Sequence, residues 1–382
     1  MGRRYVISAL IINRCLLLLV IILAIGLGGC GTNTAKNNPL INKQWYLNNY
    51  GERSLPSDDP EFQPYVFIKK GVDIDAAGMW GTIDKIPLSD TVVAIIDTGI
   101  AIDHEDLFDN IWNNKGEIPD DQIDNDGNGY IDDVCGFNFC RYDARVDAYE
   151  RSPNENMHGT ECAGIIGAMD NERGIKGIAK VQIMVLKAFD NNEDSISIED
   201  INHIVEAIKY AEDNGAKVCN MSFSSKADSP ELYNAMKSSS MLFVVSAGNG
   251  MPRGIAVDHS VFPAAYKLPN MITVANMNYG GFLEKSSNFG KETVDIMAPG
   301  TSLFTTTPEG YGYASGTSMA TAVVSGVAGL LFSLDKTATA IDIKRIINSS
   351  VTPYPLEDEK ITTGGLVNGK NAVQLLLSER SY

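Results

Sequence analysis

The run TVVAIIDTG, residues 91–99, is the stretch of sequence that decides the fold. Its first six residues are uncharged and mostly aliphatic or β-branched, which predicts a strand buried on both faces. Asp97 follows directly, so a carboxylate stands where this strand ends. Largely apolar runs of the same kind recur along the chain, at residues 183–186, 217–221, 241–245 and 271–274.

Helical patterns lie between several of these runs. Residues 201–214 repeat Ile and Val at intervals of three and four, and Gly215 then provides a helix stop. Apolar strands that alternate with helices predict an α/β fold with three layers, α/β/α, in which helices cover both faces of a central, mostly parallel sheet. Ligands bind such sheets at the carboxyl ends of the strands, so we expect the functional residues there.

Length and composition favour one folded domain. The chain has 382 residues, of which 44% are hydrophobic and 21% charged, as in a packed globular protein. We find no internal repeat and expect a continuous, monomeric domain over residues 40–382. The formal net charge of −17 repels phosphate backbones and argues against nucleic acid as a partner.

The first thirty residues have the layout of an export signal. Three arginines precede an apolar run at residues 15–27, and the sequence LGGC, residues 27–30, then leads to Cys30. Small residues before Cys30 resemble a bacterial lipoprotein signal, in which that cysteine is acylated after cleavage, and residues 31–39 would form a tether. The alternative is an uncleaved membrane anchor. Both interpretations place the domain at the cell membrane, facing outward from the cytoplasm.

Four short motifs carry groups that can do chemistry. They are DTG at residues 97–99, HGT at 158–160, SAGN at 246–249 and GTSMA at 316–320. The last precedes an apolar helix, so it places a hydroxyl at the positive end of a helix. Each motif alone is as consistent with a turn or helix cap as with catalysis.

Together, in this order, the four motifs resemble the subtilisin family of serine peptidases. FPAA at residues 262–265, SNFG at 287–290 and APG at 298–300 extend the resemblance. It implies a subtilisin-like fold and a serine endopeptidase that cuts polypeptides through an acyl-enzyme, without an organic cofactor.

The resemblance also implies a role for one residue of each motif. Ser318 would be the nucleophile and His158 the base, Asp97 would orient the imidazole, and Asn249 would donate to the oxyanion. The alternative function is a catalytically silent, subtilisin-like binding or regulatory protein.

The same resemblance assigns two substrate-binding edges. One contains Ser222, Phe223 and Ser224, and the other Ala188 and Phe189; a peptide would add to them as an extra strand. The family usually has glycine where Ser224 stands, so we expect a narrower primary pocket. Acidic residues that follow the second edge, Asp190, Glu193 and Asp194, favour either basic substrates or an ordinary solvated loop.

An acidic loop resembles the start of an EF-hand calcium site. DNDGNGYIDD, residues 124–133, spaces oxygen ligands at alternate positions and supplies a turn glycine. The candidate ligands are Asp124, Asp126, Asn128, Tyr130 and Asp132. Cys135 stands where the closing Glu belongs, so any site is either weaker or completed by Asp132, Asp133 or a distant group. A turn rich in Asp and Asn without metal is an open alternative.

A second calcium site is implied by the family resemblance alone. Gln44, Asp106 and Asn171 stand where subtilisins hold a structural calcium ion.

Two departures complete the expectations. The family match begins almost directly after the tether, so we expect no room for the usual inhibitory pro-segment. Cys135 and Cys140 either form a bridge or remain thiols, and spacing alone does not decide between these.

Overall fold

Alternate side chains of strand β1 (Val92–Asp97) pack into two different hydrophobic cores. Val93 and Ile95 belong to one core, whereas Ala94 and Ile96 belong to the other. This is the pattern of a strand covered on both faces, because successive side chains point to opposite sides of a sheet. The computed structural model describes residues 38–51, 69–147, 155–189, 196–357 and 359–380, which belong to one compact unit.

Within the described residues the central sheet has nine strands. Their order is β10-β11-β7-β6-β5-β4-β1-β3-β2, and every neighbouring pair is parallel except β10 with β11. A separate antiparallel hairpin joins β8 to β9. The strands after β1 are β2 (Gly136–Asn138), β3 (Gln182–Lys187), β4 (Val218–Met221), β5 (Leu242–Ser246), β6 (Met271–Met277), β7 (Ile296–Pro299), β8 (Leu303–Thr307), β9 (Gly310–Ala314), β10 (Thr352–Pro353) and β11 (Gly365–Leu366).

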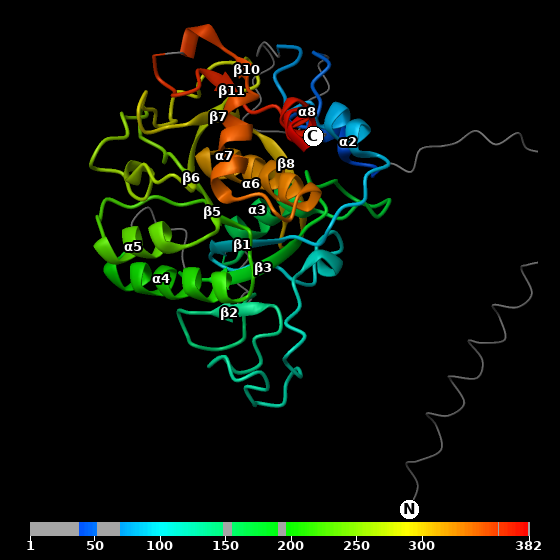
Figure 1. Cartoon of the computed structure of the whole chain (residues 1–382), viewed down its shortest axis with the longest axis vertical. Helices are drawn as coiled ribbons and strands as arrows, with labels where there is room; N and C mark the ends of the chain where they lie inside the picture. Colours follow the sequence, from blue (N-terminus) through cyan, green and yellow to red (C-terminus); the bar gives the residue numbers. More distant parts are fainter. Residues whose placement is uncertain (1–37, 52–68, 148–154, 190–195, 358, 381–382) are drawn as a thin grey trace, which may run out of the picture. The chain divides into compact units, whose positions relative to one another are not determined.

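Helices cover both faces of this sheet (Figure 1). Helices α4 and α5 pack in the core that contains Ala94 and Ile96, and the other α-helices pack in the core that contains Val93 and Ile95. The predicted three-layer α/β/α fold is therefore confirmed. The α-helices are α2 (Ala76–Ile83), α3 (Met157–Gly167), α4 (Ile198–Asp213), α5 (Pro230–Ser238), α6 (Thr317–Leu334), α7 (Ala340–Ser349) and α8 (Gly369–Arg380), and the 3₁₀ turns are η1 (Ile41–Lys43), η2 (Phe108–Asn110), η3 (Ala264–Tyr266) and η4 (Pro355–Glu357).

Local signals set the ends of these elements. The helix predicted from residue 201 begins at Ile198, because Ser197 and Asp200 form a reciprocal capping box ahead of it. It stops before Gly215, whose φ of 77° suits only a residue without a side chain. All five predicted strands are present, with ends shifted by at most three residues.

Helix α6 runs through the middle of the protein. Among the described helices it is the one long and apolar enough to cross a membrane, yet 89% of that segment is buried inside the fold. It is therefore a core helix. The predicted export signal, Cys30 and most of the tether lie outside the described residues, as do Asp190, Glu193 and Asp194.

Candidate active site

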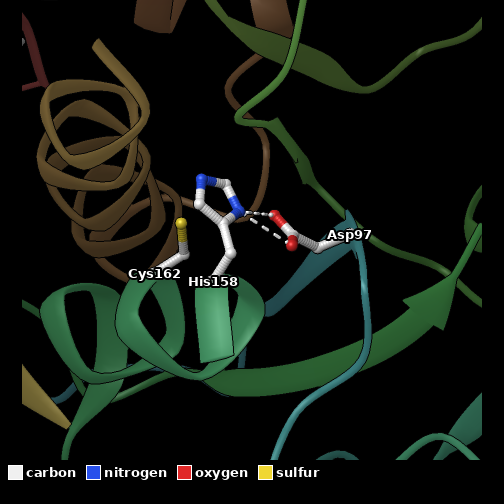
Figure 2. Close-up of side chains that lie close together, drawn as sticks. All are labelled: Asp97, His158 and Cys162. Carbon is white, nitrogen blue, oxygen red and sulfur yellow. Dashed lines mark hydrogen bonds and ion pairs between the residues drawn. The ribbon is translucent and has the colours of Figure 1, made fainter. Parts of the chain in front are cut away.

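Asp97 and His158 form a hydrogen-bonded pair at the carboxyl end of β1. The Asp97 side chain is 1% exposed, and its Oδ1 accepts a hydrogen bond from the backbone of Thr98 at 2.8 Å. The Nδ1 atom of His158 lies 2.9 Å from both carboxylate oxygens (Figure 2). A carboxylate in this position fixes the tautomer and orientation of the ring, so that Nε2 remains available as a base.

Gly159 allows helix α3 to approach the segment after β1 closely enough for this contact. A Cβ atom on Gly159 would lie 2.1 Å from the carbonyl oxygen of Gly99, which is impossible without movement of the backbone. Thr160 then ties the helix to the strand, because its Oγ1 accepts from the backbone of Ala101 at 2.9 Å. The HGT and DTG motifs therefore have two roles: they supply the candidate catalytic side chains, and they allow close backbone contact between α3 and the segment after β1.

Charges around His158 raise its pKa. Burial alone would lower the pKa of the imidazole, but the Asp97 carboxylate and Glu161 raise it above the ordinary value of 6.5. Burial also raises the pKa of Glu161 to about 7, with His158 opposing and Asp97 adding to that rise. The sequence analysis overlooked Glu161; its position three residues after His158, on the same face of α3, was the available signal.

Cys162 is a further neighbour of the pair. Its Sγ lies within 4.8 Å of an imidazole nitrogen and of a carboxylate oxygen, and Figure 2 shows the ring between the thiol and Asp97. Burial, with help from the nearby carboxylate of Asp97, raises the pKa of this thiol well above 9.0. The thiol therefore stays protonated and is a poor nucleophile. Cys162 is thus a buried free thiol.

Ser318 is the second residue of α6 and is held against the end of β4. Its Oγ donates to the carbonyl oxygen of Ser222 at 2.8 Å, and the Ser222 hydroxyl donates back to the Ser318 carbonyl at 3.0 Å. Since β4 is the neighbour of β1 in the sheet, this places Ser318 on the same edge as Asp97. The hydroxyl proton is directed at Ser222 in this rotamer, and so it is not shared with His158.

Asn249 follows β5 on the same edge. Its Oδ1 accepts hydrogen bonds from both the backbone N–H and the hydroxyl of Thr317, each at 3.1 Å, which fixes the amide so that Nδ2 remains a donor. The first N–H groups of a helix have no intrahelical partner, so the start of α6 supplies further donors beside Ser318. Such donors can stabilise a negatively charged oxygen next to the hydroxyl.

Comparison with known proteins explains this arrangement. Residues 89–371 match the peptidase family S8, described as the subtilase family. The chain belongs to the subtilase family. The match spans all four sequence motifs, although it assigns no role to individual residues.

Several curated relatives resemble this subtilase. Halolysin from Haloferax mediterranei is 32% identical over 328 residues, which are 84% of this chain and 55% of halolysin. Subtilisin-like protease 1 of Plasmodium vivax is 30% identical over 77% of this chain and 49% of its own length. An intracellular serine protease of Paenibacillus polymyxa is 30% identical over 69% of this chain and 72% of its own. The chain thus spans about half the length of the first two.

Solved structures show the same fold. A protease from Pseudoalteromonas arctica superposes with a TM-score of 0.62 at 23% identity, covering 89% of this subtilase and 99% of that chain. A cold-adapted subtilisin-like serine proteinase gives a TM-score of 0.56 at 23% identity, covering 85% and 97%. The subtilisin-like fold expected from the sequence is therefore confirmed.

The two predicted substrate edges of this subtilase lie opposite each other. Phe223 and Phe189 meet edge to face, with ring centroids 5.4 Å apart. Ala188 continues β3, where its backbone N–H donates to the Asp97 carbonyl at 3.0 Å. A Cβ atom on Gly248 would lie 2.8 Å from Oγ of Ser224, so this hydroxyl stands against the segment that leads to Asn249.

In the acidic loop, the structure groups two of the predicted ligands with one residue that the sequence analysis did not include. Carboxylate oxygens of Glu117, Asp124 and Asp126 lie within 4.8 Å of one another. Hydrogen bonds from the backbone of Gly129, then of Gly127 and Asn128, hold the pKa of Asp124 below its usual value. Sequence reasoning did not include Glu117, because it precedes the loop that it joins. Three clustered carboxylates form a donor set that suits calcium.

The other loop candidates have different partners. Oδ1 of Asn128 accepts from the backbone of Tyr130, whose ring packs against Phe137. The Asp132 carboxylate accepts backbone hydrogen bonds from Asp121 and Gln122. These side chains stabilise the loop itself. Of the predicted ligands, Asp124 and Asp126 belong to the carboxylate group, and metal binding by the other three stays a prediction.

The side chains of the second predicted calcium site form hydrogen bonds within the protein. Oε1 of Gln44 accepts from the backbone of Lys176 at 2.9 Å. The two oxygens of Asp106 accept from Asn171, Ile175 and Tyr311, and Oδ1 of Asn171 accepts from Arg173. The carboxylates of the acidic loop accept protein hydrogen bonds in the same way, so these contacts do not decide whether an ion binds here, and this calcium site stays a prediction.

The two loop cysteines do not form a bridge. Cys135 is a free thiol, half-buried, and burial raises its pKa. The alternative of a Cys135–Cys140 disulfide is therefore not realised in this structure.

Proposed function

We propose that this subtilase is a serine endopeptidase that hydrolyses polypeptides through an acyl-enzyme. The observation that carries the proposal is the Asp97–His158 pair, in which Nδ1 lies 2.9 Å from each carboxylate oxygen, at the edge of the sheet where Ser318 lies in the first turn of α6. In this role Ser318 attacks the scissile carbonyl, and His158 takes its proton and returns it to the leaving amine. Asp97 orients the ring and stabilises its cation.

Activation requires one rotation of the serine side chain. The Ser318 hydroxyl must turn from the Ser222 carbonyl toward Nε2 of His158, a change between staggered rotamers. Bound substrate favours this change, since hydrogen bonds of catalytic groups often tighten only in the complex. Nδ2 of Asn249 and the N–H groups at the start of α6 then receive the oxyanion.

A covalent probe tests the function directly. A fluorophosphonate should label the folded wild-type chain, and both labelling and cleavage of a denatured protein substrate should disappear in Ser318→Ala. Loss of the nucleophile is expected to lower kcat by about 10⁶-fold, a magnitude established on subtilisin itself. A folded wild-type chain that neither reacts nor cleaves would instead support the silent binding protein.

We also propose a structural calcium ion in the acidic loop. Glu117, Asp124 and Asp126 would hold it, and it would supply positive charge to a group of close carboxylates, without taking part in bond cleavage. The hydrogen bonds that these carboxylates accept from the loop backbone support a structural role, because an ion there would brace the turn between residues 117 and 133.

Membrane attachment through Cys30 and action as a monomer remain part of the proposal. The small residues before Cys30 and the apolar run ahead of it support acylation. Replacing Cys30 with Ser should move the protein from the membrane to the soluble fraction and change the mass of the mature chain. Unchanged fractionation and mass would contradict lipid attachment.

A further inference from the structure

A buried lysine lies beside the Asp97–His158 pair and takes no part in the chemistry proposed above. Lys187 ends β3, an otherwise uncharged strand, and its side chain is 0% exposed. Its Nζ forms an ion pair with Oε1 of Glu155 at 2.9 Å, and the Glu155 side chain is 11% exposed. Burying two charges is costly, so a pair kept at this position calls for an explanation.

The sheet register places Lys187 next to Asp97. The two residues are paired partners in the parallel strands β3 and β1. Paired residues point to the same face of a sheet, and here that face carries Val93, Ile95 and Val185, which pack in the core that contains α3. The Lys187 side chain lies against the loop after Asp97, with its Cδ atom 3.3 Å from the position that a Cβ atom on Gly99 would occupy.

The other partner stands at the start of the helix that carries His158. Glu155 precedes the N-cap Asn156 and lies three residues before His158. A negative charge is favourable at a helix N-terminus, and the ammonium group of Lys187 fixes where that charge sits. The ion pair thus connects β3, the strand beside Asp97, to the first turn of α3.

We propose that the Lys187–Glu155 ion pair is a positioning device that holds His158 against Asp97 and balances the charge around the imidazole. The proposal rests on the peptidase function proposed above. Among the described residues, the titratable groups around His158 are Asp97 on β1, Glu161 and the protonated Cys162 on α3 itself, and the ion pair at the start of that helix. The other elements packed on this helix, α6 and β8, carry no titratable side chain in TSMATAVVSGVAGLLFSL and LFTTT.

The two partners have opposite charges, and this gives the proposal a distinctive signature. Removing Lys187 leaves an extra negative charge near His158, which favours the imidazolium and should move the acid limb of the kcat/KM profile to higher pH. Removing the Glu155 charge leaves an extra positive charge and should move that limb to lower pH. A purely structural loosening would not separate the two variants in this way.

The experiment compares full-length Lys187→Met and Glu155→Gln with wild type on one peptide substrate. We expect kcat to fall by about 10- to 100-fold in each, the cost of misplacing a reacting group by up to 1 Å, with a smaller change in KM. The acid limbs should shift in opposite directions, and Lys187→Arg should restore part of kcat. Lys209→Met, which breaks the exposed Lys209–Asp213 pair, is the matched control and should leave the profile unchanged.

Unchanged kcat in both folded variants, or acid limbs that shift the same way, would overturn the inference. If Lys187→Met does not fold, Glu155→Gln and Glu155→Asp decide: the first should shift the limb and lower kcat, the second should lower kcat and keep the limb. The inference is also overturned if neither Glu155→Gln nor Glu155→Asp gives its expected result. Wild type measured in parallel separates the two proposals, because an inactive wild type contradicts the peptidase function itself.

Discussion

The carboxyl group of Glu161 shares one face of α3 with the imidazole of His158, one turn further along the helix. Each group changes the pKa of the other: Glu161 helps to raise that of His158, and His158 opposes the rise that burial causes in Glu161. The proposed base therefore works beside two carboxyl groups, Asp97 and Glu161. This has consequences for both activity and stability.

Glu161→Gln should shift the pH dependence of activity. The substitution keeps the shape of the side chain but removes a negative charge that raises the pKa of His158. A base with a lower pKa is neutral at lower pH, so the acid limb of kcat/KM should move to lower pH. Glu199→Gln is the control, because it makes the same change at an exposed position of α4. A limb that stays in place would contradict the coupling.

The same variant should gain stability at alkaline pH. The folded-state pKa of Glu161, about 7, lies above its unfolded value near 4.5, so the folded chain binds this proton more tightly. Stability is then lost as pH rises from 4.5 through 7. Gln cannot ionise and avoids this loss. Above pH 7 the free energy of unfolding of the variant should exceed that of wild type by about 1–2 kcal/mol, which raises Tm by a few degrees. Below pH 5 the two Tm values should converge. Calorimetry across this range measures the difference.

Asn249 offers a test that separates its two contacts. Asn249→Ala removes both the Nδ2 donor and the Oδ1 acceptor for Thr317, and kcat should fall by about 10²–10³-fold, a magnitude established on subtilisin itself. Asn249→Asp keeps an acceptor for Thr317 but cannot donate to an oxyanion. If kcat falls at least as far in Asn249→Asp as in Asn249→Ala, the loss comes from the Nδ2 donor. A near-normal kcat in Asn249→Asp would contradict a role for that donor.

Removing calcium should lower thermal stability without a direct effect on bond cleavage. An ion bound only by the folded state at 100 times its Kd adds about 2.7 kcal/mol. A chelator should therefore lower Tm in wild type, and much less in Asp124→Asn, which weakens the carboxylate group. Asp103→Asn serves as the control, since that exposed residue belongs to neither predicted calcium site. An equal fall in Tm on addition of chelator in wild type and Asp124→Asn would contradict the proposed calcium site.

Residues that act at strand ends were predictable from sequence, whereas those that act through burial were not. Asp97, Asn249 and Ser318 each follow or precede an apolar run within a few residues, so local pattern places them at one edge of the sheet. Glu161 and Lys187 look like ordinary surface charges in the sequence. Tertiary packing gives them significance, because it buries Lys187 next to Asp97 in the sheet and places Glu161 near the imidazole of His158.

The metal predictions differ for the same reason. The acidic loop was recognisable because its carboxylates are close in sequence, yet its third member, Glu117, lies outside the motif and joins it through the fold. Gln44 and Asp106 were matched by position alone. Their oxygens already accept protein hydrogen bonds, a fact that depends on donors such as Tyr311 more than 200 residues from Asp106 along the chain.

Ser224 should limit the size of the substrate side chain that precedes the scissile bond. The segments after β4 and β5 leave neighbouring strands and flank Ser318, so a side chain next to the attacked carbonyl enters between them. Since Oγ of Ser224 stands against Gly248, Ser224→Gly should raise kcat/KM for Phe relative to Ala at this position by about 10-fold or more. Ser225→Gly is the matched control, because that hydroxyl donates to Ile196 instead. A peptide series measures both ratios, and an unchanged Phe-to-Ala ratio in Ser224→Gly would show that this hydroxyl does not shape the pocket.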